Sequence, residues 1–286
     1  MKHAITGITG TVGGGVAREL LATGQSVCAV LRDPDKARPW ADRGCAIAVA
    51  SLDDVSALTR AFTEVDSVFV LLPANFDPAP GFPEVKAILA AVRAALVATR
   101  PGRVVCISTI GAQTSTENLL SQLGLMERAF SDLPMPIAFL RPAWFIENAR
   151  WDVASARQTG TIQSFLQPLD KRFPMVATAD VASAAARQLR ATWTGRCVLE
   201  LEGPVRISPN DIAAALSRLL DKPVRADAVP RETWEGLFRA QGMTNPTPRM
   251  RMLDGFNEGW IEFEAGAAHS MKGTTQLDTV LTTLVA

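Results

Sequence analysis

A glycine-rich turn near the start of the chain is the first pattern that could do chemistry. Gly7, Gly10 and Gly13 follow a short apolar run and lead directly into a helical pattern. Gly7 would make the tight turn, Gly10 would let the backbone approach a pyrophosphate, and Gly13 would let the helix pack closely on the strand. The helix start would offer unpaired N–H groups to the phosphates. The spacing therefore predicts a dinucleotide site, and the residues expected to face it are Gly7, Thr9, Gly10, Thr11, Val12 and Gly13.

The choice of cofactor depends on the end of the second predicted strand, about twenty residues beyond the glycines. The sequence has Arg32 and Asp33 there. A guanidinium favours the 2′-phosphate of NADP through a charged, bidentate contact, whereas a carboxylate favours the ribose hydroxyls of NAD. Arg32 thus predicts that NADP(H) is preferred, and Asp33 leaves NAD(H) possible. The alternative is that Arg32 is a solvated charge, with Asp33 and Pro34 starting the next helix.

Asp53 follows the third predicted strand in the run Ser51-Leu52-Asp53. At the carboxyl end of a parallel strand it could border the adenine of the same cofactor. It could equally be only the N-cap of the following helix. The sequence leaves both interpretations open.

The chain contains no tyrosine, and no lysine occurs between Asn118 and Arg141. This excludes the Tyr-x-x-x-Lys pair with which short-chain dehydrogenases move the substrate proton. A simple ketone would become an alkoxide, whose conjugate acid is very weak, so it needs a positioned acid. A quinone or azo compound spreads the charge over its own π system. The sequence therefore favours a conjugated acceptor protonated by water, Ser108 or Thr109, or cofactor binding without turnover.

His269 is the only histidine outside the first strand. It could supply a proton near neutral pH. The alternative is a surface residue in a polar C-terminal loop.

Six apolar strands alternate with five helices through the first half of the chain, which is typical of βαβ units. The predicted strands are His3–Thr6, Ser26–Leu31, Ala46–Ala50, Ser67–Leu71, Arg103–Ser108 and Pro136–Arg141. The predicted helices lie near Val12–Thr23, Pro34–Arg43, Asp53–Phe62, Pro83–Thr99 and Asn118–Ser131. We expect an α/β fold of the Rossmann type, with a doubly wound parallel sheet. The carboxyl ends of its strands would bring the residues above to one edge.

The second half shows a looser pattern, with a helix over Ala179–Arg190 and a strand over Cys197–Glu202. We expect residues 1–150 to form the nucleotide-binding core. Residues 151–286 would form a smaller α/β portion, packed on the core, that adds one strand to the sheet and one wall to the substrate cleft. The long proline-rich loop from Leu71 to Pro83 could also line the cofactor.

Composition excludes several other classes of protein. The 29 basic residues balance 29 acidic ones with no basic stripe, which argues against direct binding of nucleic acid. Four scattered cysteines, without ligand spacing, predict reduced thiols rather than disulfides or a metal site. No signal peptide or membrane-spanning run is visible, so we expect a cytoplasmic protein. No motif points to a flavin.

The chain resembles the NmrA-like, atypical branch of the short-chain dehydrogenase superfamily. The resemblance rests on the three glycines, Arg32, the run Ser51-Leu52-Asp53 and Asp180-Val181-Ala182. Its most specific part is the run Leu140-Arg141-Pro142-Ala143-Trp144-Phe145-Ile146-Glu147-Asn148. The branch contains quinone reductases, flavin-free azoreductases, triphenylmethane reductases and non-catalytic redox sensors of the NmrA type, which occur as monomers or small oligomers.

The resemblance implies which residues surround the nicotinamide and the substrate. The ends of the fourth to sixth strands would place Leu72, Pro73, Ser108, Thr109, Pro142 and Trp144 near the nicotinamide. Phe76, Trp144 and Phe145 would form a planar wall for a small conjugated aromatic substrate, unless they are only core residues. Glu147 and Asn148 would fix the loop after the sixth strand. Some relatives carry a lysine in the fifth helix, which this chain lacks.

Overall fold

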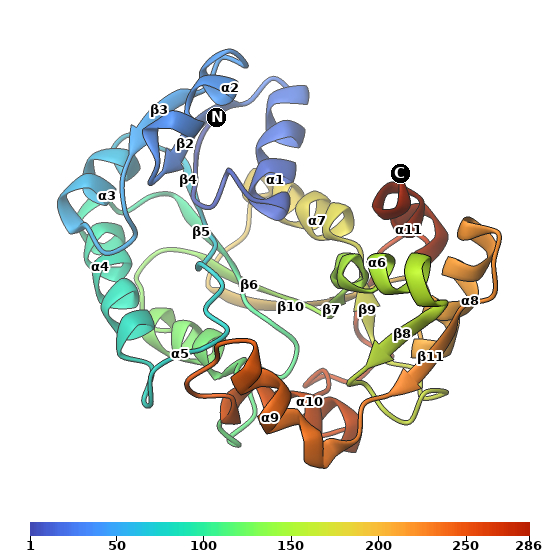
Figure 1. Ribbon diagram of the computed structural model, residues 1–286. Helices are drawn as coiled ribbons and strands as arrows, with labels where there is room; N and C mark the ends of the chain where they lie inside the picture. Colours follow the sequence, from blue (N-terminus) through green and yellow to red (C-terminus); the bar gives the residue numbers. More distant parts are fainter.

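A single eight-stranded parallel sheet runs through the molecule, and the computed structural model describes it over residues 1–286 (Figure 1). The strand order is β12-β10-β6-β5-β4-β1-β2-β3, which reverses direction between β1 and β4. The strands are β1 Lys2–Ile5, β2 Ser26–Leu31, β3 Ala46–Val49, β4 Ser67–Val70, β5 Arg103–Ile107, β6 Ile137–Pro142, β10 Arg196–Glu202 and β12 Met271–Lys272. The predicted doubly wound α/β fold is confirmed.

Helices cover both faces of the sheet, so the central strands are apolar on both sides. Figure 1 shows α1 (Thr11–Ala22) and α7 (Thr178–Arg190) on one face, and α3 (Val55–Phe62), α4 (Pro83–Thr99) and α5 (Ser121–Phe130) on the other. β4 and β6 are buried along their whole length. Helices α1 and α7 approach closely because Gly15 has no side chain: a Cβ there would lie 2.7 Å from that of Ala182.

The C-terminal portion forms two small sheets and a second layer of helices. β8 (Thr161–Ser164) pairs with β11 (Arg225–Ala228), and β7 (Trp144–Phe145) pairs with β9 (Met175–Val176). Around them pack α6 Arg150–Thr159, α8 Pro209–Leu220, α9 Trp234–Ala240, α10 Thr247–Glu258 and α11 Leu277–Val285. This portion contributes two strands to the large sheet, β10 and β12, where one was expected. None of the helices combines the length and apolar character needed to cross a membrane.

Local side-chain chemistry explains where elements differ from expectation. The helix expected over Pro34–Arg43 is a 3-10 turn, Pro34–Lys36, followed by the four-residue α2, Arg38–Ala41. Pro39 interrupts it because proline has no N–H to donate. Asn118 does not start α5, since its side-chain oxygen accepts from Leu120 N at 2.8 Å and forms a turn instead.

Asp54, rather than Asp53, caps helix α3. Its Oδ1 accepts a hydrogen bond from the backbone N–H of Ala57 at 2.9 Å. The capping interpretation of Asp53 was therefore wrong by one residue. Asp53 is left exposed beside the carboxyl end of the sheet.

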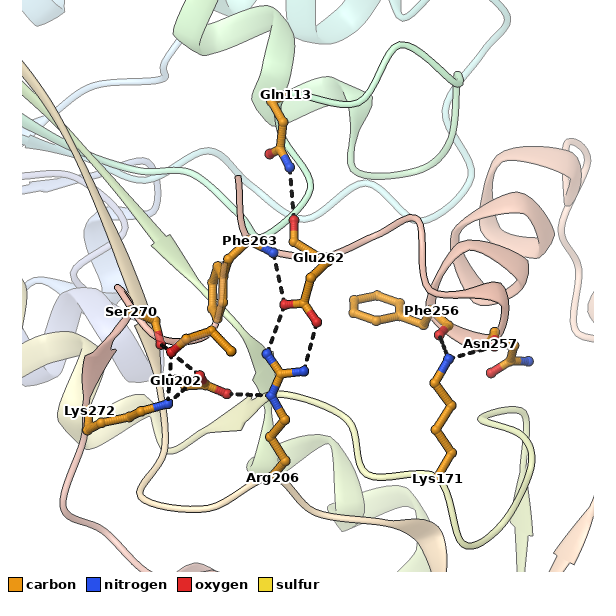
Figure 2. Close-up of polar contacts among 11 residues, drawn as sticks. Gln113, Lys171, Glu202, Arg206, Phe256, Asn257, Glu262, Phe263, Ser270 and Lys272 are labelled. Carbon is orange, nitrogen blue, oxygen red and sulfur yellow. Dashed lines mark hydrogen bonds and ion pairs between the residues drawn. The ribbon is translucent and has the colours of Figure 1, made fainter. Parts of the chain in front are cut away.

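The segment 259–272, here called the strap, joins α10 to β12 and is held by charged groups (Figure 2). The buried carboxylate of Glu202 accepts from Ser270 Oγ at 2.7 Å, Lys272 Nζ at 2.5 Å and Arg206 Nε at 3.0 Å. Arg206 also binds both oxygens of Glu262, at 2.7 and 2.9 Å. These contacts fix the strap against the end of β10, so the last sheet strand cannot separate freely from the core.

Candidate functional site

The glycine turn after β1 forms an open cradle of backbone groups. Gly7 has a φ of +63°, and the Gly10 N–H donates to its carbonyl at 3.0 Å. A Cβ on Gly13 would lie 2.4 Å from the Gly7 carbonyl oxygen, so only glycine fits there. Gly10 is exposed and has no atom of another residue closer than 3.4 Å to its missing Cβ. The turn therefore leaves space directly above Gly10.

The start of α1 has the chemical features of an anion-binding site. The N–H groups of Thr11, Val12 and Gly13 have no acceptor within the protein. No side chain caps the helix and no acidic residue lies in its first turn. Thr9, Gly10 and Thr11 are exposed, while the side chain of Val12 packs into the core. Free N–H groups at the positive end of a helix dipole fit the pyrophosphate of a dinucleotide.

Arg32 lies at the end of β2, exposed and without an ion-pair partner. Asp53 follows the neighbouring strand β3: hydrogen bonds from the Ser51 hydroxyl and from its own backbone N–H lower the pKa of the Asp53 carboxyl, and the Arg32 charge adds a smaller lowering. The Asp33 carboxylate is already engaged, because it accepts a hydrogen bond from the Asp35 N–H at 3.1 Å. A free guanidinium and a carboxylate of lowered pKa thus follow the carboxyl ends of β2 and β3, and Asp33 belongs to the turn after β2.

The turn meets the neighbouring strand where the sheet order reverses. The Thr6 N–H donates to the Phe69 carbonyl at 3.1 Å, and the Thr6 hydroxyl accepts from the Leu71 N–H at 2.9 Å. Gly7 lets Leu71 approach, because a Cβ there would lie 2.9 Å from Leu71 Cδ2. The ends of β1 and β4 therefore form one rigid crevice, at the position where open parallel sheets bind ligands.

A cavity of about 280 Å³ continues from this crevice past the ends of β4, β5 and β6. It brings together the residues expected near the nicotinamide and the substrate: Leu72, Pro73, Phe76, Ser108, Thr109, Pro142, Trp144 and Phe145. Fifteen of its 22 lining residues are hydrophobic, and none is Asp, Glu, Lys, Arg or His. The Phe76 side chain is 61% exposed, which places it at the rim. The cavity thus offers an apolar, uncharged site.

Helix α10 supplies a wall that the sequence did not reveal. Met252 and Phe256 are buried and line the cavity four residues apart, on one face of the helix. The Phe256 ring packs edge-on against Trp144, with ring centroids 5.3 Å apart at an interplanar angle of 89°. In the sequence, the only indication of this wall was the apolar spacing, and it lies in a stretch that also carries arginines. Trp144 is therefore held in place by a partner more than a hundred residues away.

The two hydroxyls in the cavity differ in their hydrogen bonds. Ser108 is buried and its Oγ donates to Glu127 Oε1 at 2.5 Å. Thr109 is partly exposed and its hydroxyl has no partner in the protein. Glu127 in turn accepts from Arg141 Nε at 2.8 Å and Nη2 at 2.7 Å. Burial opposes the charge on Arg141, but Glu127 and Glu264 raise its pKa overall.

The loop after β4 is tied to the C-terminal portion by Asp77. Its carboxylate accepts from the Thr244 N–H and hydroxyl, both at 2.8 Å, and from the Asn245 N–H at 2.7 Å. Hydrogen bonds from the backbone of Thr244 and then Asn245 lower the pKa of Asp77. The loop that carries Phe76 is thereby fixed to the segment just before α10.

The loop after β6 contains the Glu147-Asn148 pair. Glu147 Oε1 accepts from the Thr178 N–H at 2.8 Å and from its hydroxyl at 2.5 Å, which holds the start of α7. Asn148 lines the cavity. Glu147 therefore has a structural contact, while Asn148 faces the site.

The structure does not bring His269 to the cavity. It is exposed on the strap, and its Nδ1 lies 2.9 Å from the Ala265 carbonyl oxygen. It is absent from the cavity lining. Of the three candidate proton sources, the cavity therefore holds Ser108 and Thr109 but not His269.

The glycine cradle, the reversal of strand order and the adjoining cavity define a Rossmann-type nucleotide-binding protein. The chain belongs to the NAD(P)H-binding family, whose model matches residues 7–192. Among curated relatives, the NAD(P)H azoreductase of Xenophilus azovorans is 28% identical over 240 residues, covering 84% of this chain and 81% of that protein. Quinone oxidoreductase 2 of Escherichia coli is 26% identical and covers 84% and 82%.

Two solved structures share the complete fold. The Escherichia coli NADPH-dependent quinone oxidoreductase in complex with NADPH has a TM-score of 0.81 at 22% identity, over 100% of both chains. The Citrobacter triphenylmethane reductase has a TM-score of 0.79 at 21% identity, over 100% of this chain and 99% of that one. The resemblance stated from the sequence is confirmed by the family match and these relatives.

Proposed function

We propose that this protein is an NADPH-dependent, flavin-free reductase of small, uncharged, conjugated acceptors such as quinones and neutral azo compounds. The observation that carries the proposal is the uncharged apolar cavity at the ends of β4, β5 and β6, beside the crevice that β1 and β4 form. The relatives named for azo and quinone reduction support the same reaction class.

The residues of the crevice fit NADPH from one end to the other. The free N–H groups of Thr11, Val12 and Gly13 would bind the pyrophosphate, and Arg32 would bind the 2′-phosphate. Leu72, Pro73 and Pro142 would place the nicotinamide against the cavity. When bound, the cofactor supplies a hydride, that is, two electrons and one proton. Arg32 is the basis for expecting NADPH rather than NADH.

The cavity restricts which acceptors can be reduced. A quinone that takes up the hydride needs one further proton to become a hydroquinone, and its anion is already stabilised by delocalisation. No lysine, tyrosine or histidine lines the cavity to assist a harder reaction. We assign the second proton to the free hydroxyl of Thr109 or to water. Simple ketones should therefore react poorly, because the alkoxide they form requires a stronger positioned acid.

The same cavity should discriminate by charge. Moving an ionised sulfonate or carboxylate from water into an apolar site that offers no opposite charge costs roughly several kcal/mol of free energy. Phe76, Trp144 and Phe145 instead offer ring faces to a neutral aromatic compound. An acceptor that carries its charge next to the reacting atoms should be excluded.

The test follows NADPH oxidation with three acceptors: a neutral naphthoquinone, the same quinone bearing a ring sulfonate, and a simple ketone. We expect turnover of the neutral quinone, at least tenfold lower kcat/KM for the sulfonate, and none for the ketone. Equal rates for both quinones would refute the charge discrimination alone. No turnover of either quinone or of a neutral azo dye added to the same assay, together with clearly different affinities for NADP+ and NADPH, would indicate a redox sensor instead.

A further inference from the structure

A carboxylate lies directly behind the cavity wall. Glu127 follows the cavity-lining Leu123 by one turn of α5, but does not line the cavity itself. Its side chain is 13% exposed, and one oxygen accepts the hydroxyl of Ser108 at 2.5 Å. Ser108, at the end of β5, does line the cavity. Ser108 therefore connects Glu127 with the cavity by a direct hydrogen bond.

The direction of this hydrogen bond is fixed by Arg141. Its guanidinium binds both oxygens of Glu127, at 2.8 and 2.7 Å, in a bidentate contact that favours the ionised carboxylate. An ionised carboxylate has no proton and only accepts, so Ser108 must be the donor. A serine hydroxyl has one hydrogen, and here it is committed. What Ser108 presents to the cavity is its oxygen lone pairs.

The ion pair of Glu127 and Arg141 keeps this orientation because Arg141 makes further hydrogen bonds through its third nitrogen, Nη1. Its side chain is 4% exposed, and Nη1 donates to Glu264 at 2.7 Å and to Gln113 Oε1 at 3.3 Å. Gln113 also donates to the Glu262 carbonyl at 2.8 Å, and Figure 2 shows this contact leading to the strap. A continuous set of hydrogen bonds thus connects the cavity wall with the strap.

We propose that Glu127 is a positioning residue that makes Ser108 a hydrogen-bond acceptor for the carboxamide N–H of the nicotinamide ring. The inference rests on the proposed cofactor. The carboxamide is the donor group of that ring, so an oriented acceptor fixes which way the ring lies. The same arrangement removes Ser108 as a proton donor and leaves Thr109 as the hydroxyl free to donate.

The principal test is a double-mutant cycle read by calorimetric titration with NADP+, which requires no turnover. Ser108→Ala removes the acceptor without altering a charge, and Glu127→Gln removes the charge that orients it. Each should weaken NADP+ binding by about five- to tenfold, the range of a single hydrogen bond. The double variant should bind no more weakly than Ser108→Ala, because Glu127 acts through Ser108. Losses that multiply would overturn the proposal.

Glu264→Gln is the matched control, since Glu264 also contacts Arg141, at 2.7 Å, and is 60% exposed, whereas the third carboxylate on Arg141, Glu200, is buried. It should leave NADP+ affinity unchanged. A loss equal to that of Glu127→Gln would show that the network only supports the fold, and the proposal would fail. Far-ultraviolet circular dichroism checks folding, and Ser108→Ala keeps the test valid if Glu127→Gln does not fold.

Turnover gives an independent readout. At saturating NADPH, Thr109→Val should lower kcat by about tenfold or more, as expected for loss of a proton donor, and by more than Ser108→Ala lowers it. A large loss of kcat in Ser108→Ala with unchanged NADP+ affinity would identify Ser108 as the donor and refute the inference. If no acceptor is turned over, the proposed function fails, while the NADP+ titrations still decide this proposal.

Discussion

The two ends of the cleft are built in different ways. The cofactor end uses backbone groups from one continuous segment, Gly7 to Gly13. Its key positions are glycines, where a side chain would not fit. The acceptor end uses side chains from the loops after β4, β5 and β6 and from α10. Backbone N–H groups impose the same geometry in any sequence that keeps the turn, whereas a cavity changes with each side chain. Substitutions should therefore change which acceptor the protein takes more readily than which cofactor it binds.

The two ends also differ in charge. Arg32 and the free N–H groups of α1 provide positive potential at the cofactor end. The acceptor end has no charged lining residue, and behind its wall Glu127 is ion-paired with Arg141, which also contacts Glu200 and Glu264. Under the proposed function, a phosphate-bearing molecule would be directed to one end, and a neutral ring to the other.

The largest effect on ligand binding is expected from Gly13→Val. A Cβ would lie 2.4 Å from the Gly7 carbonyl oxygen, and that atom is backbone and cannot move aside. We expect loss of NADP+ binding by calorimetry and destabilisation of about 3 kcal/mol in urea unfolding. Gly236→Ala on α9 is the control, since its Cβ would meet nothing within 4 Å. It should bind normally and gain about 0.5–1 kcal/mol. A Gly13→Val protein with normal affinity would disprove the backbone cradle.

Arg32→Ala should have the next largest effect, confined to the phosphate of the adenosine end. A charge-assisted contact contributes about 1.5–3 kcal/mol, so NADPH affinity should fall by about ten- to a hundredfold. NADH affinity should stay within about twofold, because it lacks the 2′-phosphate. Lys36→Ala is the matched control, as that charge sits on the following turn and contacts Asp33 at 3.7 Å. Equal losses for both coenzymes would mean that Arg32 does not read the 2′-phosphate.

Phe256→Leu should affect the acceptor end alone. It removes the edge-on contact with Trp144, and such aromatic pairs contribute about 0.5–1.5 kcal/mol. We expect the KM for the neutral quinone to rise about fivefold and the Kd for NADP+ to stay unchanged. Steady-state kinetics and calorimetry on the same preparation separate the two. A parallel loss of NADP+ affinity would show that the two ends are not independent.

The sequence predicted the parts of the site that depend on local chain. The glycine turn and Arg32 lie within one βαβ unit, where spacing alone determines the geometry. The doubly wound parallel sheet followed from the alternation of strands and helices. Leu72, Ser108 and Pro142 came together because the carboxyl ends of parallel strands share an edge.

The parts that were missed depend on contacts between distant segments. Phe256 reaches Trp144 from a helix whose apolar pattern is weak, and β12 is only two residues long. The bond from Ser108 to Glu127 was hidden because it is defined by Arg141, on another strand. His269 had the right chemistry in the sequence but lies on the strap, outside the cavity. Residue type indicates possible chemistry, and only the packing of distant segments decides whether it is used.

The smallest effect on ligand binding in the cleft is expected from Asp152→Asn. Its effect on the free energy of unfolding should nevertheless be measurable. Asp152 lies in the first turn of α6, just after the acceptor end, and has no hydrogen-bond partner. Burial raises the pKa of its carboxyl from an ordinary 3.8 to about 7. Between these values the folded protein holds a proton that the unfolded chain has lost, so the stability of the wild type falls as pH rises.

Asparagine cannot ionise, so Asp152→Asn should escape this loss. Its free energy of unfolding should match the wild type near pH 4, exceed it increasingly up to pH 7, and keep that advantage above. The advantage is at most about 4 kcal/mol, from about three pH units at roughly 1.4 kcal/mol each. Urea unfolding at pH 4, 6 and 8 measures it, while NADP+ affinity and quinone KM should not change. An unchanged difference at all three pH values would show that Asp152 titrates normally, and a shifted quinone KM would show that α6 shapes the acceptor end.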